Sequence, residues 1–237
     1  MPFLKMCLGE SQIQKERLNK MKKGSQKNFC IATGMLIAFL LWTAAIQFVD
    51  MQTIGPQESS VGFATINRFV HNLTGVHMSL YTATDWLGLV PLGFVMGFAL
   101  LGVIQWIQRK QLLKVDYNIL VLGGFYIIVM TAYVFFEMVV VNYRPVLIDG
   151  VLEASYPSST TMLVMCVMPT AVMQLNARLK KLVLKRFITS AITVFVVFMV
   201  IGRFVSGVHW FTDIIGGALL STGLVLMYRA VVSLEVG

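Results

Sequence analysis

Charged residues are scarce in this sequence. Asp, Glu, Lys and Arg make up only 13% of the 237 residues, whereas 57% are hydrophobic. This balance excludes an ordinary soluble protein and is typical of a chain that crosses a membrane several times. A membrane-spanning helix needs about 20 mostly apolar residues. We therefore predict an all-α fold, a bundle of six transmembrane helices in one membrane domain over residues 30–237, with spans near 30–49, 87–107, 119–141, 159–177, 187–205 and 214–233.

Cysteine is also rare. Cys7, Cys30 and Cys166 are the three in the chain, and they lack the spacing of a metal site or a disulfide framework. The sequence contains no Gly-rich phosphate loop, no acidic metal-binding cluster and no dinucleotide fingerprint. It therefore predicts neither a metal nor a cofactor.

Positive charge is in excess, with a net charge of +8, but it is unevenly distributed. Most Lys and Arg residues lie in the tail 1–29 and in the loops after the second and fourth spans, and only Arg68, Arg144 and Arg203 lie on the other side. The positive-inside rule then makes both termini cytoplasmic. This topology explains the net charge without nucleic acid and favours a plasma-membrane protein. The tail is a basic cytoplasmic segment, and residues 3–21 suit either an amphipathic helix on the membrane surface or a disordered chain.

Three reactive side chains cluster where the fifth span ends and the sixth begins, on the predicted outer side. Arg203 suits an anion, because a guanidinium fork matches phosphate geometry. His209 suits a nucleophile or a base. Asp213 follows four residues later, so in a helix both side chains share one face, where a carboxylate fixes the imidazole tautomer and stabilises its cation.

A second outer loop adds to this cluster. It holds Arg144 and ends in the run Ser158, Ser159 and Thr160, which starts the fourth span. Such a run either simply caps the helix or, with the free N–H groups and the helix dipole, forms a cradle for an anion. Two arginines, a helix N-terminus and an activated histidine together predict a phosphoryl-binding site on the outer face.

At these positions the chain resembles the type 2 phosphatidic acid phosphatase family of integral membrane lipid phosphatases. Its first motif, Lys, six residues, Arg-Pro, is matched at Arg144-Pro145, and its second, Pro-Ser-Gly-His, at Pro157-Ser158. Its third, Ser-Arg, five residues, His, three residues, Asp, is matched in spacing by Arg203, His209 and Asp213. The resemblance covers most of residues 60–230. It implies that His209 is a nucleophile forming a phosphohistidine, that Asp213 orients it, and that Arg144, Arg203 and Ser158 bind the phosphoryl oxygens.

The sequence departs from these motifs at four positions. Glu137 stands where the family has lysine, Ser159 where it has glycine, and Gly202 where it has serine. Thr160 replaces the histidine that protonates the leaving group. Threonine is too weak an acid for that role, and losing a general acid costs about 10²–10⁴ in rate.

Three explanations of these departures stay open. Another acid serves, from among Glu137, Glu153, His71, His77 and water, or the leaving group is a phosphate that needs little protonation. Alternatively, Glu137 recognises a cationic headgroup, and the chemistry is headgroup transfer. Otherwise the protein is a catalytically weak relative that binds or transports lipid phosphate. Glu137 is equally compatible with an ion pair to Arg144 or Arg203.

Our expectation is a membrane lipid phosphatase or diphosphatase that acts through a phosphohistidine. A polyprenyl diphosphate such as undecaprenyl diphosphate, or a phosphatidate-type lipid, is the expected substrate. The expected partners are therefore the lipid phosphate and the bilayer, and the site is expected to face the outer side. A transporter with a coincidental motif is disfavoured, because the sequence has no convincing internal repeat.

Overall fold

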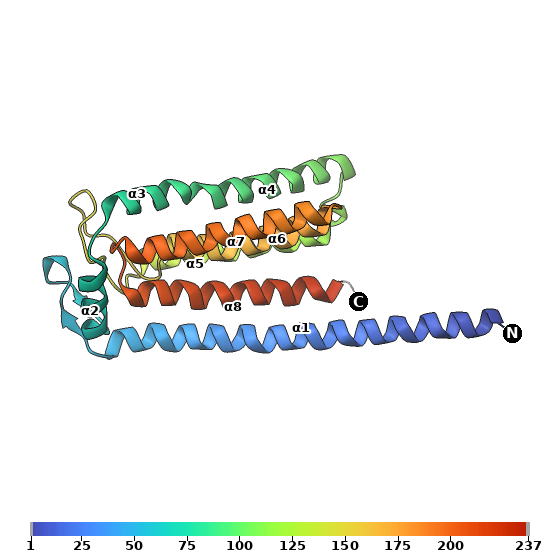
Figure 1. The fold of residues 1–237 in the computed structure, drawn as a ribbon, viewed down its shortest axis with the longest axis horizontal. Helices are drawn as coiled ribbons and strands as arrows, with labels where there is room; N and C mark the ends of the chain where they lie inside the picture. Colours follow the sequence, from blue (N-terminus) through green and yellow to red (C-terminus); the bar gives the residue numbers. More distant parts are fainter. Residues whose placement is uncertain (1, 236–237) are drawn as a thin grey trace.

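The computed structural model describes the backbone of residues 2–235 and the side chains of residues 22–234. Helices run side by side along one long axis (Figure 1). The helices are α1 (Pro2–Phe48), α2 (Ala64–Thr74), α3 (Met78–Leu87), α4 (Leu89–Arg109), α5 (Tyr117–Met138), α6 (Ser159–Arg178), α7 (Leu182–Val205) and α8 (Phe211–Glu235), with the short 3-10 turns η1 (Pro56–Glu58) and η2 (Leu112–Lys114) and the two-residue strands β1 (Gln52–Thr53) and β2 (Ser60–Val61).

Six helical segments within this part of the chain are long and apolar enough to cross a membrane, which confirms the predicted six-helix bundle. They are Lys22–Phe48, Met78–Arg109, Tyr117–Met138, Ser159–Arg178, Leu182–Val205 and Phe211–Leu234. The side chains of residues 1–21, Cys7 among them, lie outside the described residues. The membrane-surface helix proposed for this tail therefore stays a prediction, although the backbone of α1 is helical from Pro2.

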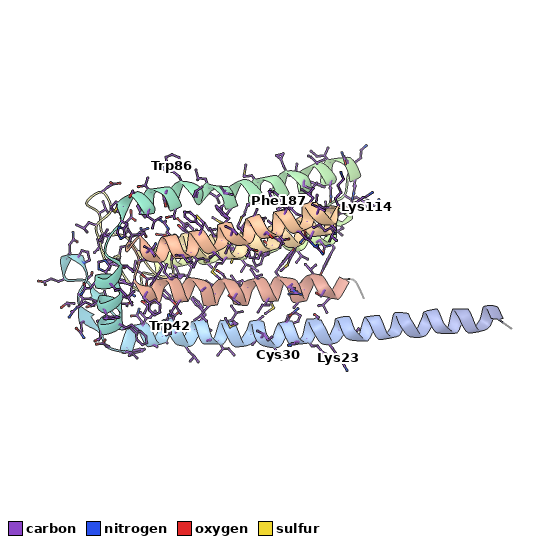
Figure 2. The ribbon with its side chains drawn as sticks, in the orientation of Figure 1. Lys23, Cys30, Trp42, Trp86, Lys114 and Phe187 are labelled. Atoms are coloured by element: carbon purple, nitrogen blue, oxygen red, sulfur yellow. The ribbon has the colours of Figure 1, made fainter. Side chains whose placement is uncertain are left out.

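The two ends of the bundle differ in character. Helix α2 and the loops 49–63, 139–158 and 206–210 lie at one end, which we call the site end, and both chain termini lie toward the other (Figure 1). Lys23 and Lys114 lie toward the termini, whereas Trp42 and Trp86 lie nearer the site end (Figure 2). This arrangement fits the charge bias from which the cytoplasmic placement of the termini was predicted.

The second span begins earlier than the predicted residue 87. Helix α3 starts at Met78 and meets α4 at Gly88, so the two form one continuous span. Thr82, Thr84 and Asp85 lower the local hydropathy, which is why the sequence suggested a loop there. Helix α3 instead packs closely against α7. A β-carbon on Gly202 of α7 would lie 2.8 Å from Thr84 Cγ2, so this contact depends on glycine.

Helix α6 lies at the centre of the bundle and packs against α4, α5, α7 and α8. Half of its most apolar window is buried, more than in any other span. Helix α8 packs along α1 and comes close to the loop before α6, because Gly216 has no side chain. A β-carbon there would lie 2.4 Å from the ring of Tyr156. The Tyr156 hydroxyl also lies 2.7 Å from Thr43 Oγ1, so this loop is fixed to both α1 and α8.

Candidate active site

His209 lies in the short turn between α7 and α8. Gly207, in the same turn, has a φ of +69°, and a β-carbon on it would lie 1.9 Å from the carbonyl oxygen of Gly75. The turn therefore requires glycine at this position. The imidazole of His209 is only 4% exposed. Because α8 begins at Phe211, His209 precedes the helix, and the helical spacing to Asp213 that we considered from the sequence does not apply.

Ser155 connects the histidine to the carboxylate. His209 Nδ1 lies 3.0 Å from Ser155 Oγ and 3.1 Å from the Ser155 carbonyl oxygen. Ser155 Oγ donates a hydrogen bond of 2.5 Å to Asp213 Oδ2. Since the hydroxyl proton is used on Asp213, both Ser155 oxygens accept from the Nδ1–H group. This arrangement leaves a lone pair on His209 Nε2, which has no hydrogen-bond partner among the described residues.

Asp213 is fully buried in the first turn of α8. It accepts hydrogen bonds from Ser155 Oγ, from the Trp210 backbone N–H at 2.9 Å and from Asn142 Nδ2 at 3.3 Å. No hydrogen bond joins Asp213 directly to His209 in the described part of the chain. The carboxylate therefore reaches the imidazole through Ser155, whereas the sequence suggested a direct pair.

The electrostatic environment keeps His209 neutral. Burial lowers the pKa of this histidine well below its ordinary value, and the positive charges of Arg144 and Arg203 lower it further. A neutral imidazole with its proton on Nδ1 is the form that can attack an electrophile through Nε2.

Arg203 is almost completely buried, at 1% exposure. Its Nη2 group forms an ion pair of 2.9 Å with Asp85 and donates to Thr160 Oγ1 at 2.5 Å. The central carbon of its guanidinium group, Cζ, lies 4.7 Å from the centre of the Tyr81 ring. Its Nε–H has no partner among the described residues and remains available for an anion.

Arg144 is the second buried cation, at 8% exposure. Its Nε atom lies 3.1 Å from Glu153 Oε2, which is an ion pair without hydrogen-bond geometry. Neither Nε nor Nη1 has a hydrogen-bond partner within the described chain. Two buried guanidinium groups with unused N–H donors are unfavourable unless an anion completes them.

The run Ser158, Ser159 and Thr160, at the start of α6, lies beside these groups. Ser158 is completely buried, its Oγ has no partner among the described residues, and its backbone N–H donates to the Asp213 carbonyl oxygen at 3.1 Å. The Ser158 side chain therefore does not cap α6, which removes the first of the two explanations for this run at that residue, and its buried hydroxyl is left without a partner in the described part of the chain. Ser159 and Thr160 both line the cavity described next.

A cavity of about 480 Å³ brings the charged groups together. Arg144, Arg203, Asp85, Glu137 and Glu153 all line it. A smaller adjoining cavity is lined by His209 and shares four wall residues with the first: Tyr133, Glu137, Ala154 and Ser159. Of the predicted phosphate-binding residues, Ser158 lines neither cavity. The others, together with His209 and both glutamates, line the two adjoining cavities at the site end: Arg144, Ser159, Thr160 and Arg203.

The two other histidines do not line either cavity. His71 Nε2 lies 3.1 Å from the Gly207 carbonyl oxygen, and His77 Nε2 lies 2.9 Å from that of Thr74. The backbone N–H of His77 also donates to the Ser206 carbonyl oxygen at 2.9 Å. The His71 imidazole and the His77 backbone thus hold the turn that carries His209, whereas the His77 imidazole hydrogen-bonds to Thr74, outside that turn. Of the alternative acids considered from the sequence, Glu137 and Glu153 are the side chains that line the cavities.

Three residues of the site were not found from the sequence. Ser155 and Asn142 hold Asp213, and Asp85 holds Arg203. Asp85 lies in the second span, ahead of all three motifs. Ser155 and Asn142 lie within two residues of the motif positions Pro157 and Arg144, and this proximity was the available signal. Among the described residues no group of three His, Cys, Asp or Glu side chains is arranged to hold a metal ion.

These features define a class: a polytopic membrane protein with a buried, arginine-rich anion site and an unpartnered imidazole at one end of its helix bundle. The sequence model of the PAP2 superfamily matches residues 92–235, and the chain belongs to that superfamily. This match confirms the resemblance drawn from the three motifs. Asp85 lies outside the matched residues.

A solved structure has the same overall fold. It is the crystal structure of a transmembrane PAP2-type phosphatidylglycerolphosphate phosphatase from Bacillus subtilis, with a TM-score of 0.56 and 20% sequence identity. The similarity covers 86% of this chain and 96% of that one. No curated protein sequence matches the chain. At this identity the structural likeness supports the shared fold, whereas superfamily membership supports phosphatase chemistry in general.

Proposed function

We propose that this protein is a membrane lipid phosphatase in which His209 Nε2 attacks the phosphorus atom. The observation that carries the proposal is the unpartnered Nε2 atom of a neutral, buried histidine beside a cavity lined by Arg144 and Arg203. Their unused N–H donors suit the equatorial phosphoryl oxygens. Ser158, whose hydroxyl has no partner among the described residues, stands between Pro157 and Ser159, which line the cavities, and is proposed as a further donor.

The reaction has two steps. The Nε2 lone pair forms a bond to phosphorus, while the bond from phosphorus to the leaving oxygen breaks and its electron pair stays on that oxygen. The product is a phosphohistidine whose ring carries positive charge, which Asp213 stabilises through the Ser155 hydroxyl. Water then attacks phosphorus and gives a proton to the solvent, while the bond from phosphorus to Nε2 breaks, its electron pair stays on Nε2, and inorganic phosphate leaves.

The leaving group limits the substrate. Thr160 cannot donate a proton near neutral pH, so we propose a lipid phosphate whose leaving group needs little protonation. A polyprenyl diphosphate meets this condition, because its leaving group is itself a phosphate, and a phosphatidate-type lipid is the second substrate to test. The charge bias supports placing this site at the outer face of the plasma membrane, level with the lipid headgroups.

The test compares His209→Ala with His77→Ala in detergent. We expect His209→Ala to lose phosphate release from both lipids. His77→Ala should retain it, because the His77 imidazole lines neither cavity and hydrogen-bonds to the Thr74 carbonyl oxygen. Radiolabelled substrate should label the wild-type protein through an acid-labile, base-stable bond. Undiminished turnover by His209→Ala would refute the nucleophile. Binding of lipid phosphate by the wild type without any release would instead indicate a binding or transport protein.

A further inference from the structure

The side chains that line the 480 Å³ cavity carry more negative than positive charge. Three carboxylates, those of Asp85, Glu137 and Glu153, face two guanidinium groups. Asp85 pairs with Arg203 at 2.9 Å, and Glu153 pairs with Arg144 at 3.1 Å. Each arginine therefore already has an acidic partner, and a simple phosphate dianion entering this cavity adds negative charge to a negative surface.

Glu137 is the carboxylate of this cavity that forms no ion pair with either arginine. It lies in the last turn of α5, and no ion pair joins it to any side chain between residues 22 and 234. The sequence allowed an ion pair between Glu137 and Arg144 or Arg203, but the structure gives those arginines other partners. Glu137 also lines both cavities, so it borders the cavity of the histidine as well as that of the arginines.

Two tyrosines share the cavity walls with this carboxylate. Tyr133, one turn before Glu137 on α5, lines both cavities, and Tyr143 lines the larger one. A carboxylate beside tyrosine rings is a favourable environment for an ammonium group, because the ring faces attract cations and the carboxylate supplies the counter-charge. The unused N–H donors of Arg144 and Arg203 meanwhile remain for phosphoryl oxygens.

We propose that Glu137, with Tyr133 and Tyr143, binds a positively charged amino or quaternary ammonium group that adjoins the substrate's phosphate. This proposal rests on the proposed function, since the phosphoryl group must occupy the site formed by His209 and the arginines. It narrows the substrate class to lipid phosphates or diphosphates that also carry an amino or quaternary ammonium group, with the phosphate at the arginines and the cation at Glu137. The ligand then neutralises the surplus carboxylate, which a diphosphate alone does not do.

The experiment measures binding directly and does not depend on turnover. Dissociation constants of phosphocholine, phosphoethanolamine and glycerol 3-phosphate are determined by titration calorimetry on the purified full-length protein in detergent. The variants are Glu137→Gln, Glu137→Lys and the control Asp149→Asn. Asp149 is an exposed acid in the loop between α5 and α6 that lines neither cavity, so its variant removes one negative charge elsewhere on the site end.

We expect the wild type to bind the two cationic phosphates about 10- to 100-fold more tightly than glycerol 3-phosphate, the range for a charge-assisted contact. Glu137→Gln should bring this ratio close to one, Glu137→Lys should reverse it, and Asp149→Asn should leave it unchanged. A wild-type ratio near one, or a ratio that survives in Glu137→Gln, would overturn the proposal.

Turnover separates this inference from the proposed function. Phosphate release from lipid diphosphates with no cation selectivity in binding refutes the role of Glu137 and leaves the role of His209 standing. Cation-selective binding without release from any lipid phosphate refutes the phosphatase and retains the site. An equal loss of kcat on all substrates in Glu137→Gln, with the binding ratio unchanged, would identify Glu137 as the missing acid and overturn the proposal.

Discussion

Replacing Ser155 by alanine tests how Asp213 acts on His209. The substitution removes the hydroxyl that donates 2.5 Å to Asp213 and accepts from His209 Nδ1 at 3.0 Å, while the backbone carbonyl at 3.1 Å remains to hold the Nδ1 proton. A hydrogen bond to a charged group contributes about 1.5–3 kcal/mol. We therefore expect Ser155→Ala to lower kcat/KM about 10- to 100-fold, with the loss mainly in kcat because phosphate contacts are untouched.

The decisive measurement is a double-mutant cycle with Asp213→Asn. If the carboxylate acts through the serine, the double variant should be no slower than Asp213→Asn alone, so the two effects are strongly non-additive. Ser221→Ala is the matched control, because Ser221 is a buried serine of α8 that itself lines neither cavity and donates to the Met162 carbonyl oxygen, with no hydrogen bond to His209 or Asp213. Full additivity, or a Ser155→Ala rate within about twofold of the wild type, would refute the connection through Ser155.

Two further predictions concern the missing acid and the charge of the nucleophile. Thr160→His should raise kcat on lipid monophosphates by up to about 10²-fold but leave kcat on diphosphates nearly unchanged, because only the alcohol leaving group of a monophosphate needs a proton. Kinetics measured in parallel on both substrates test this, and an unchanged kcat on monophosphates would contradict it. The pKa of His209 is lowered by burial and by Arg144 and Arg203, so the reactive neutral form persists as pH falls through 6.5 and is lost only below that. A pH profile of kcat/KM should therefore show no acid limb at 6.5, and a limb at or above that value would disprove the electrostatic argument.

The sequence was sufficient for the span count and for the gathering of Arg144, Arg203, His209 and Asp213 at one end. Apolar runs of membrane length determine the number of spans, and successive loops lie on alternate sides of the membrane, which determines the end at which each residue lies. Both patterns can be read from the sequence. The start of the second span was misplaced because residues 78–86 carry polar side chains that are accommodated against α7.

The contacts between site residues were not predictable in the same way. Ser155 stands between His209 and Asp213 only because the loop before α6 folds over the start of α8, where Gly216 allows Tyr156 to approach. Asp85 reaches Arg203 only because α3 packs on α7. Such contacts depend on how helices that are distant in the sequence pack together. The spacing of residues within one segment does not predict them.

The glycine that precedes Arg203 sets a limit on redesign. Serine is usual there in the family's motif, yet in this chain a side chain at position 202 would meet Thr84 Cγ2 at 2.8 Å. Transplanting the family's Ser-Arg pair would thus push α7 away from α3 and draw Arg203 away from Asp85. The residues at positions 84 and 202 are therefore sterically coupled. When the motif is exchanged between members of the superfamily, both positions have to be changed together.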